Sequence, residues 1–286
     1  MSPRFVVLDA PVLAALALLL CDLLAPAARA QTLQADYQVQ NTYASSVGSI
    51  GPLTVVGGTD ASFVQTTVDS QSQLVLELGT GGDFNAPPVP PTGVQTQTNP
   101  FLSASNYSVV LLADFSLDVN LVATKVFDFK NLSSDSGLYI NDTTGLLSFY
   151  DGTNTTVGTN PFTSGNYGQI VLTRNGTTNV TDIYVNGTLD ITFTDTSGAA
   201  ILGDATASGN SFLTLFKDDG TGVGSTVVPE STTGDIARLR LYVGVLDAAT
   251  VANLDRTVPE PATWTWGGIG VLVLVFGFRR RAAAVA

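Results

Sequence analysis

Residues 166–193 read NYGQIVLTRNGTTNVTDIYVNGTLDITF, and this stretch carries the clearest strand signals of the chain. Apolar side chains recur at every second position from Leu189 to Phe193, which is the spacing of a half-buried β-strand. Asn186-Gly187, between two such runs, accepts the positive φ angles of a type I′ turn. The stretch therefore predicts an antiparallel β-hairpin.

The same strand character recurs along the central sequence, in runs bounded by Gly, Asn, Asp or Thr clusters. Many short strands separated by turns predict an all-β fold in which antiparallel strands form a sandwich or barrel. A single helix is predicted over 247–254, with Asp247 as its N-cap, packed on the edge of the sandwich. The strand runs are 73–78, 107–117, 125–129, 146–150, 169–173, 182–185, 189–193, 212–216 and 236–242.

Composition excludes several classes of function. The chain has 286 residues, with 12 Lys and Arg against 24 Asp and Glu, no His, and one Cys, Cys21. A net charge of −12 leaves no clustered cations for a phosphate backbone, so nucleic-acid binding is not expected. Without His, a Ser-His-Asp or Cys-His nucleophile system is excluded, and so are zinc and haem sites that use His ligands.

The first 30 residues have the features of a secretory signal peptide. Arg4 supplies a positive n-region, residues 11–20 are apolar, and Ala30 completes an A-x-A cleavage site. Signal peptidase is therefore expected to cut after Ala30 and to leave Gln31 as the first mature residue. An uncleaved membrane anchor and a lipoprotein attached through Cys21 are the alternatives.

The last 29 residues form a second targeting segment. The tripeptide Pro259-Glu260-Pro261 precedes an apolar run of 15 residues, 264–278, and a basic end. At about 1.5 Å per residue, this run spans about 22 Å as a helix, which predicts a short transmembrane helix with interfacial tryptophans and cytoplasmic arginines. The anchoring residues are Trp264, Trp266, Phe278, Arg279, Arg280 and Arg281.

The order of tripeptide, short apolar helix and arginine cluster resembles the PEP-CTERM sorting signal of Gram-negative bacteria that produce exopolysaccharide. The resemblance implies processing near the tripeptide by exosortase, a membrane protease-transpeptidase. The chain would be anchored transiently in the inner membrane and then released from, or attached to, the cell surface or extracellular matrix. The expected organisation is a signal peptide over 1–30, one domain over 31–257 and the sorting signal over 258–286.

Three segments of the central region resemble, in the right order, the laminin-G-like, concanavalin A-like jelly-roll family. Residues 166–174 resemble its W-H-H-V-A-L-T-R strand, with Tyr167 in the place of the Trp. Residues 182–187 resemble its l-Y-v-N-G hairpin, and residues 238–251 resemble its closing strand and helix. The resemblance covers residues 32–256 and implies a two-sheet antiparallel jelly roll.

Residues 85–100 are rich in Pro and Thr. We expect them to form a long loop within one domain. The alternative is a linker that separates residues 31–84, and a domain of that size without Cys would be near the limit of independent stability.

No catalytic pair is evident in the sequence. Glycosidases use two carboxylates about 5–9 Å apart. Glu77 and Glu230 are the only glutamates of residues 31–257, and neither has an acidic partner two or four positions further on. Asp114 and Asp118 share one face of a strand but would lie about 13 Å apart. The sequence therefore predicts no catalytic residues and no enzyme activity.

Two short segments are candidate ligand sites. Asp218 and Asp219 are adjacent carboxylates in a Gly-rich loop, which suits Ca²⁺, and the family resemblance implies a rim calcium of this kind. A solvated acidic turn is the alternative, and Asp204 and Asp128 are weaker candidate ligands. Tyr150-Asp151 combines a ring that can stack on a pyranose with a carboxylate that accepts hydroxyl protons, so it is the candidate sugar-binding pair.

Taken together, these features predict an exported, non-enzymatic protein of the cell surface or extracellular matrix. It would bind extracellular polysaccharide or other surface proteins. A purely structural matrix or sheath component without a ligand is one alternative, and a divergent glycoside hydrolase is another. Calcium is the one cofactor suggested.

Overall fold

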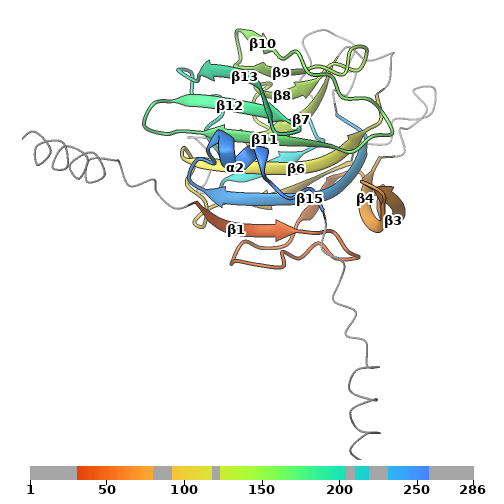
Figure 1. The fold of residues 1–286 in the computed structure, drawn as a ribbon. Coiled ribbons are helices and arrows are strands. Elements are labelled where there is room, and N and C mark those ends of the chain that lie inside the picture. Colours follow the sequence, from red (N-terminus) through yellow and green to blue (C-terminus); the bar gives the residue numbers. More distant parts are fainter. Residues whose placement is uncertain (1–30, 80–91, 118–122, 204–209, 219–230, 258–286) are drawn as a thin grey trace, which may run out of the picture. The chain divides into compact units, whose positions relative to one another are not determined.

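The computed structural model describes residues 31–79, 92–117, 123–203, 210–218 and 231–257. These residues form two antiparallel β-sheets that pack against each other across a hydrophobic core (Figure 1). The predicted all-β sandwich of two antiparallel sheets is therefore confirmed. The predicted signal peptide and the predicted sorting signal lie outside the described residues.

The first sheet consists of β1 (Thr32–Tyr37), β3 (Ala61–Val68), β4 (Gln71–Leu78), β6 (Tyr107–Phe115), β11 (Gly168–Arg174), β12 (Val180–Val185), β13 (Thr188–Thr194) and β15 (Gly234–Val243). Its order is β13-β12-β11-β6-β15-β4-β3. The first part of β15 pairs with β4, and the later part pairs with β1. The N-terminal strand β1 is thus held by a strand from the C-terminal part of the chain.

The second sheet consists of β2 (Thr54–Gly57), β5 (Thr92–Gln97), β7 (Thr124–Asp128), β8 (Gly137–Ile140), β9 (Leu147–Tyr150), β10 (Thr155–Val157) and β14 (Phe212–Leu215). Its order is β10-β9-β8-β7-β14-β5-β2. Aromatic side chains fill the space between the sheets, as in the edge-to-face pair of Phe115 and Phe162, whose ring centroids lie 5.2 Å apart.

Alternation along each strand decides which side chains reach the core. In β6, Val109 and Leu111 lie in the main core, whereas Val110 and Leu112 belong to separate clusters on the outer face. The predicted hairpin is confirmed, because Asn186 and Gly187 join β12 to β13 with φ angles of 50° and 83°. Apolar side chains of this sheet are therefore buried on both of its faces.

The predicted long loop over 85–100 is wrong for residues 92–97. They form β5, an interior strand between β14 and β2. The sequence TGVQTQ hides this strand because its inward side chains include threonine. The Thr96 hydroxyl is buried and lies 2.7 Å from the Tyr37 hydroxyl, so a hydrogen bond replaces apolar packing there.

The single predicted helix is present as α2 (Ala248–Ala252), which begins at the predicted N-cap. The Asp247 carboxylate accepts a hydrogen bond of 2.7 Å from the Thr250 amide. Its predicted position at the sandwich edge is wrong, since it packs on the outer face of the first sheet (Figure 1). The cause is a patch of outward apolar side chains on three neighbouring strands, which Val251 covers: Val110, Val171 and Tyr184.

The part of the chain that the structure describes contains no helix with the length and apolarity needed to cross a bilayer. The predicted transmembrane segment, 264–278, lies outside those residues.

Candidate functional site

Three carboxylates from three neighbouring strands lie side by side on the outer face of the first sheet. Asp235 of β15 is directly opposite Asp114 of β6 on one side and Glu77 of β4 on the other. Directly opposite residues have Cβ atoms about 4.5–5.5 Å apart. These three half-buried residues are termed the carboxylate row.

Each member of the carboxylate row is oriented by a different neighbour. The Tyr167 hydroxyl donates to Asp235 Oδ2 at 2.9 Å. The Gly165 amide donates to Asp114 Oδ1 at 2.9 Å, and the Ser62 hydroxyl donates to Glu77 Oε2 at 3.3 Å. The row therefore presents fixed acceptor oxygens beside an aromatic ring.

Burial and neighbouring charge raise the pKa of two members of the carboxylate row, Asp235 and Asp114. Burial raises the pKa of Asp235, and the charges of Glu77 and Asp114 raise it further, against the hydrogen bond from Tyr167. Burial also raises the pKa of Asp114. The row can accept hydrogen bonds from hydroxyl groups, but no three acidic side chains among the described residues converge to hold a metal ion.

Asp235→Asn is expected to stabilise the protein at pH 7 by about 0.5 kcal/mol, the scale of one cross-strand pair. The raised pKa of Asp235 means that the unfolded chain ionises first as the pH increases from about 4. Above the raised pKa, ionised Asp235 therefore lowers the free energy of unfolding of the wild type. This effect disappears as the pH falls toward the ordinary pKa of 3.8. Urea denaturation at a series of pH values measures the difference.

The control for this prediction is Asp151→Asn, because hydrogen bonds from the Asn154 and Thr153 amides lower the pKa of Asp151. Its substitution should give no gain at pH 7. Equal behaviour of the two variants across the pH range would contradict the repulsion assigned to the row.

Sequence reasoning missed the carboxylate row because it sought acidic partners of Glu77 within one strand. The partner, Asp235, is supplied across the pairing of β4 with β15. The outward position of each side chain can be read from alternation, but which strands are neighbours cannot. Asp118 and Glu230 lie outside the described residues.

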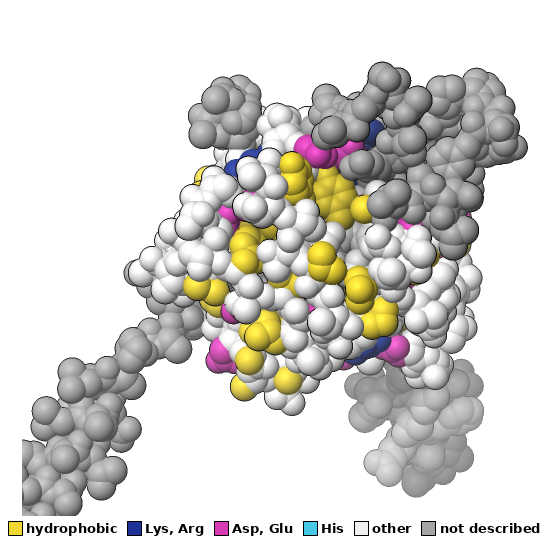
Figure 2. Space-filling model, turned by 90° about the horizontal axis from the view of Figure 1, so that it is seen from above, with side chains coloured by type: hydrophobic (Ala, Val, Ile, Leu, Met, Phe, Trp, Pro, Cys, Tyr) yellow, Lys and Arg dark blue, Asp and Glu magenta, His cyan; other side chains and the backbone are white. Residues whose placement is uncertain are grey.

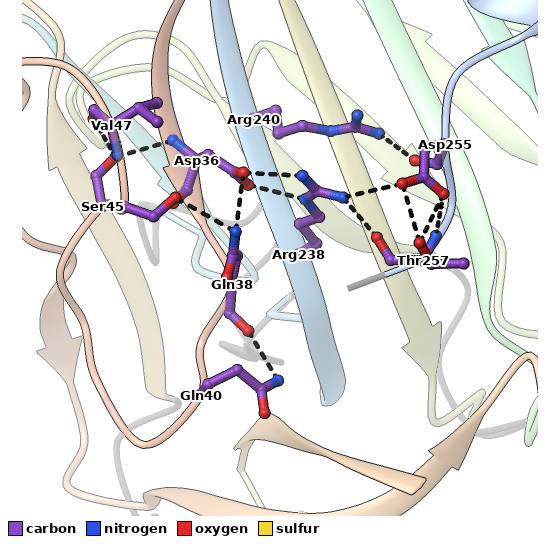
Figure 3. A network of polar contacts seen from close by, with 10 residues as sticks. Asp36, Gln38, Gln40, Ser45, Val47, Arg238, Arg240, Asp255 and Thr257 are labelled. Carbon is purple, nitrogen blue, oxygen red and sulfur yellow. Dashed lines mark hydrogen bonds and ion pairs between the residues drawn. The ribbon is translucent and has the colours of Figure 1, made fainter. Parts of the chain in front are cut away.

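A second polar cluster on this face holds residues 255–257, termed the C-terminal strap (Figure 3). Arg238 of β15 donates from Nε to Asp36 Oδ1 and from Nη2 to Asp36 Oδ2, both at 2.8 Å. Its Nη1 donates to the Thr257 carbonyl. Arg238 therefore joins the first strand of the sandwich to the last described residue.

The other two strap residues are held as well. Arg240 Nη2 donates to the Asp255 carbonyl at 2.6 Å. Arg256 donates to Asp69 Oδ2 at 3.1 Å in the β3–β4 turn and to Asn186 Oδ1 at 2.6 Å in the β12–β13 turn. The fold thus fixes the chain up to the residue before 258, where the predicted sorting signal begins.

The structure places the predicted calcium ligand Asp218 in a buried position, not in a solvated turn. Its Oδ1 lies 2.8 Å from Lys125 Nζ, and Asp128 Oδ2 lies 3.6 Å from the same nitrogen. The sequence analysis did not single out Lys125, whose place between the two aspartates depends on tertiary contacts. Asp204 and Asp219 lie outside the described residues.

In the predicted sugar-binding pair, Asp151 serves the turn between β9 and β10. Its Oδ1 accepts hydrogen bonds from the Thr153 and Asn154 amides at 2.8 and 2.6 Å. Tyr150 is half-buried and alternates with the core residue Phe149, so its ring lies on the outer face of the second sheet. Tyr150 therefore offers a ring, while the carboxylate beside it is already oriented by the backbone.

Of the predicted processing residues, Gln31 is described, and its side-chain amide donates to the Val245 carbonyl at 2.7 Å. The other predicted processing and anchoring residues lie outside the described residues: Ala30, Pro259, Glu260, Pro261, Trp264, Trp266, Phe278, Arg279, Arg280 and Arg281.

Exposed apolar side chains offer no single large platform on the face drawn in Figure 2, where hydrophobic groups are spread among polar ones. Scattered exposed apolar residues are ordinary features of a soluble surface. The large hydrophobic side chains exposed among the described residues are Val47, Phe101, Val157 and Leu189.

No protein-family model matches the sequence, and no curated protein matches it significantly. Among solved structures, 78% of the chain aligns with 98% of domain 4 of AbnA, a GH43 extracellular arabinanase from Geobacillus stearothermophilus in complex with arabinotriose. The TM-score is 0.52 and the sequence identity is 17%.

Botulinum neurotoxins give a similar likeness. For type C, which depends on interaction with two ganglioside molecules to enter cells, the TM-score is 0.53 at 14% identity. For the binding domain of neurotoxin DC in complex with rat synaptotagmin II, the TM-score is 0.52 at 14% identity. The alignments cover 80% of this chain but only 51% and 52% of the neurotoxin chains. These likenesses concern the fold alone.

Proposed function

We propose that the chain is an exported, non-catalytic protein whose β-sandwich binds carbohydrate at the surface or in the extracellular matrix of a Gram-negative bacterium. The fold likeness to domain 4 of the arabinanase carries this proposal, because that domain is in complex with an arabinose oligomer and is matched over 98% of its length. A concanavalin A-like, laminin-G-like jelly roll is the finer classification that we propose for the sandwich.

The carboxylate row is the site that we assign to carbohydrate. Sugar hydroxyls donate hydrogen bonds to carboxylates, and the Tyr167 ring beside Asp235 adds an apolar surface. The row lies on the outer face of a sheet, in half-buried positions where such bonds are stronger than in water. Tyr150 on the second sheet is the competing location.

Export and sorting complete the proposal. Signal peptidase would cut after Ala30 and leave Gln31 as the first residue of the mature chain. Exosortase would process the chain near Pro259-Glu260-Pro261. The Gln31 side chain donates to the Val245 carbonyl, just after β15, and Arg238 donates to the Thr257 carbonyl in the C-terminal strap. Both proposed processing points would therefore be close in sequence to residues that the sandwich holds by hydrogen bonds.

The test starts from protein recovered outside the producing cells, whose intact mass reports both chain ends. A start at Gln31 and loss of 264–278 are expected. The protein is then titrated with arabinan, β-glucans and the producer's own exopolysaccharide, and binding is measured by calorimetry. Glu77→Gln and Asp235→Asn should each lower the association constant by about tenfold, since each removes a charge-assisted hydrogen bond.

Asp60→Asn is the matched control, since it removes an exposed carboxylate outside the row and should leave binding unchanged. If Tyr150→Ala loses binding while the variants of the carboxylate row keep it, the binding site lies on the second sheet. Absence of binding to every glycan would leave a purely structural matrix component.

A glycoside hydrolase is the second candidate function, favoured by the position of two carboxylates in the row. Glu77 and Asp235 are directly opposite each other, and retaining glycosidases hold their two carboxyl groups about 5–5.5 Å apart. The raised pKa of Asp235 is also the direction that a general acid needs. If reducing ends are released in the same titrations, and this release is abolished in Glu77→Gln, the chain is a glycoside hydrolase and not a non-catalytic binding protein.

A further inference from the structure

A lysine ammonium lies among oxygen atoms on the outer face of the second sheet. Lys125 of β7 is fully buried, and its Nζ is 2.8 Å from Asp218 Oδ1 and 3.6 Å from Asp128 Oδ2. The same Nζ donates to the Ser134 carbonyl at 3.3 Å and lies 5.2 Å from the centre of the Tyr139 ring. Two carboxylates and a carbonyl therefore face this ammonium.

The oxygen atoms around Lys125 are not fully used by the protein. Asp128 Oδ1 accepts hydrogen bonds from the Lys130 and Leu132 amides, whereas Oδ2 accepts none from the described residues. Thr214 is directly opposite Asp128 on β14, and its buried hydroxyl also has no partner among the described residues. Buried polar atoms normally find partners, so these two oxygens indicate a site for a cation with further ligands.

The backbone leaves room for the lysine stem at one defined point. Gly137 of β8 pairs with Asp128, and a Cβ placed on Gly137 would lie 3.4 Å from Lys125 Cε and 3.6 Å from Cδ. That Cβ would also lie 2.4 Å from the Phe127 carbonyl oxygen. The carbonyl contact is a clash, so the close approach of β7 requires glycine at 137, whereas the distances to the lysine stem are those of ordinary packing. The stem of Lys125 therefore runs over Gly137 on its way to the two aspartates.

Carboxylate, hydroxyl and carbonyl oxygens are the ligands that Ca²⁺ takes in proteins. We propose that Lys125 is a built-in cation occupying an oxygen-lined site that would otherwise take Ca²⁺, with Asp128, Asp218 and Thr214 as its side-chain ligands. Asp218, the residue that the sequence assigns to calcium, is then satisfied without metal. Lys125 serves in this way whether or not the domain binds carbohydrate.

The proposal predicts that the wild-type full chain is insensitive to calcium and that loss of the ammonium creates a calcium site. The melting temperature of the wild type should be the same in excess chelator and in excess CaCl₂. Lys125→Ala should melt lower in chelator and rise by about 5 °C in CaCl₂, the shift expected when a ligand far above its Kd binds only the folded state. The double variant Lys125→Ala, Asp218→Asn should not respond.

Tb³⁺, which replaces Ca²⁺ and emits when a nearby aromatic ring is excited, gives a second readout. Emission through tyrosine should appear in Lys125→Ala, stay absent in the wild type, and fall when Tyr139→Phe is added. Lys125→Met keeps the aliphatic stem over Gly137 and carries the same predictions if the alanine variant does not fold. A folded Lys125 variant without any response to Ca²⁺ or Tb³⁺, or a wild-type response abolished by Asp218→Asn, would overturn the proposal.

Discussion

Asp195→Ala is expected to lower the free energy of unfolding by about 3–5 kcal/mol, the range for removal of one partner from a buried ion pair. Arg174 Nε lies 2.9 Å from Asp195 Oδ2, and the two side chains are 1% and 0% exposed. The Asp195 carboxylate also accepts hydrogen bonds from the Ala199 and Ala200 amides at 2.7 and 3.1 Å. The substitution would leave the buried Arg174 charge without its counter-ion, and the Arg174 Nε and the two amides without an acceptor.

Chemical denaturation at pH 7 measures this loss, with Asp69→Asn as the control. Asp69 pairs with Arg256 at the surface, where the two side chains are 39% and 31% exposed, so its substitution should cost less than about 1 kcal/mol. Asparagine also tolerates the positive φ of 46° at this position. The double variant Arg174→Met, Asp195→Ala should recover part of the loss, because it removes the stranded charge. A loss in Asp195→Ala no larger than that in Asp69→Asn would contradict the role assigned to the buried pair.

Arg238→Ala is expected to lower the free energy of unfolding by about 3 kcal/mol and to loosen both ends of the sandwich. It removes the two-bond contact with Asp36 in β1 and the bond to the Thr257 carbonyl in the C-terminal strap (Figure 3). Amide hydrogen exchange should therefore accelerate in residues 32–37 and 255–257 before it accelerates in the second sheet.

The pH dependence of this loss has a defined sign. Burial would raise the pKa of Asp36, but the hydrogen bond and charge of Arg238 outweigh it and hold that pKa below its ordinary value of 3.8. The pair therefore stabilises the fold above about pH 4, and its contribution disappears as the pH falls through the lowered pKa. The difference between wild type and Arg238→Ala should shrink in acid.

Arg238→Lys is the matched variant, since it keeps the charge without the two parallel bonds and should fall between the two proteins. Unchanged hydrogen exchange in β1 and the C-terminal strap of Arg238→Ala would show that the Arg238 hydrogen bonds do not hold these two segments on the sheet.

Much of the local structure follows from the sequence. Alternating apolar residues predict strands such as β13, and Asn186-Gly187 predicts the hairpin turn, because both signals act between residues that are neighbours in the chain. The N-cap of α2 at Asp247 is found in the same way. Where polar side chains take inward positions, as in residues 92–97, the alternation signal fails and the strand is missed.

The sites depend on which strands become neighbours. Asp235 meets Glu77 and Asp114 only because β15 pairs with β4 and β6. Lys125 reaches Asp218 because β7 and β14 are adjacent in the second sheet. Asp235 is far in sequence from Glu77 and Asp114, and Lys125 is far in sequence from Asp218.

The sequence by itself thus determined the all-β class, the positions of most strands and the inward or outward direction of their side chains, since these depend on local alternation. Only the tertiary structure brings together the carboxylate row, the arginines that bind the C-terminal strap, and the lysine between two aspartates. Each of these groups joins segments that are distant in the sequence, and cross-strand register is set by burial of the whole core, which no local pattern encodes.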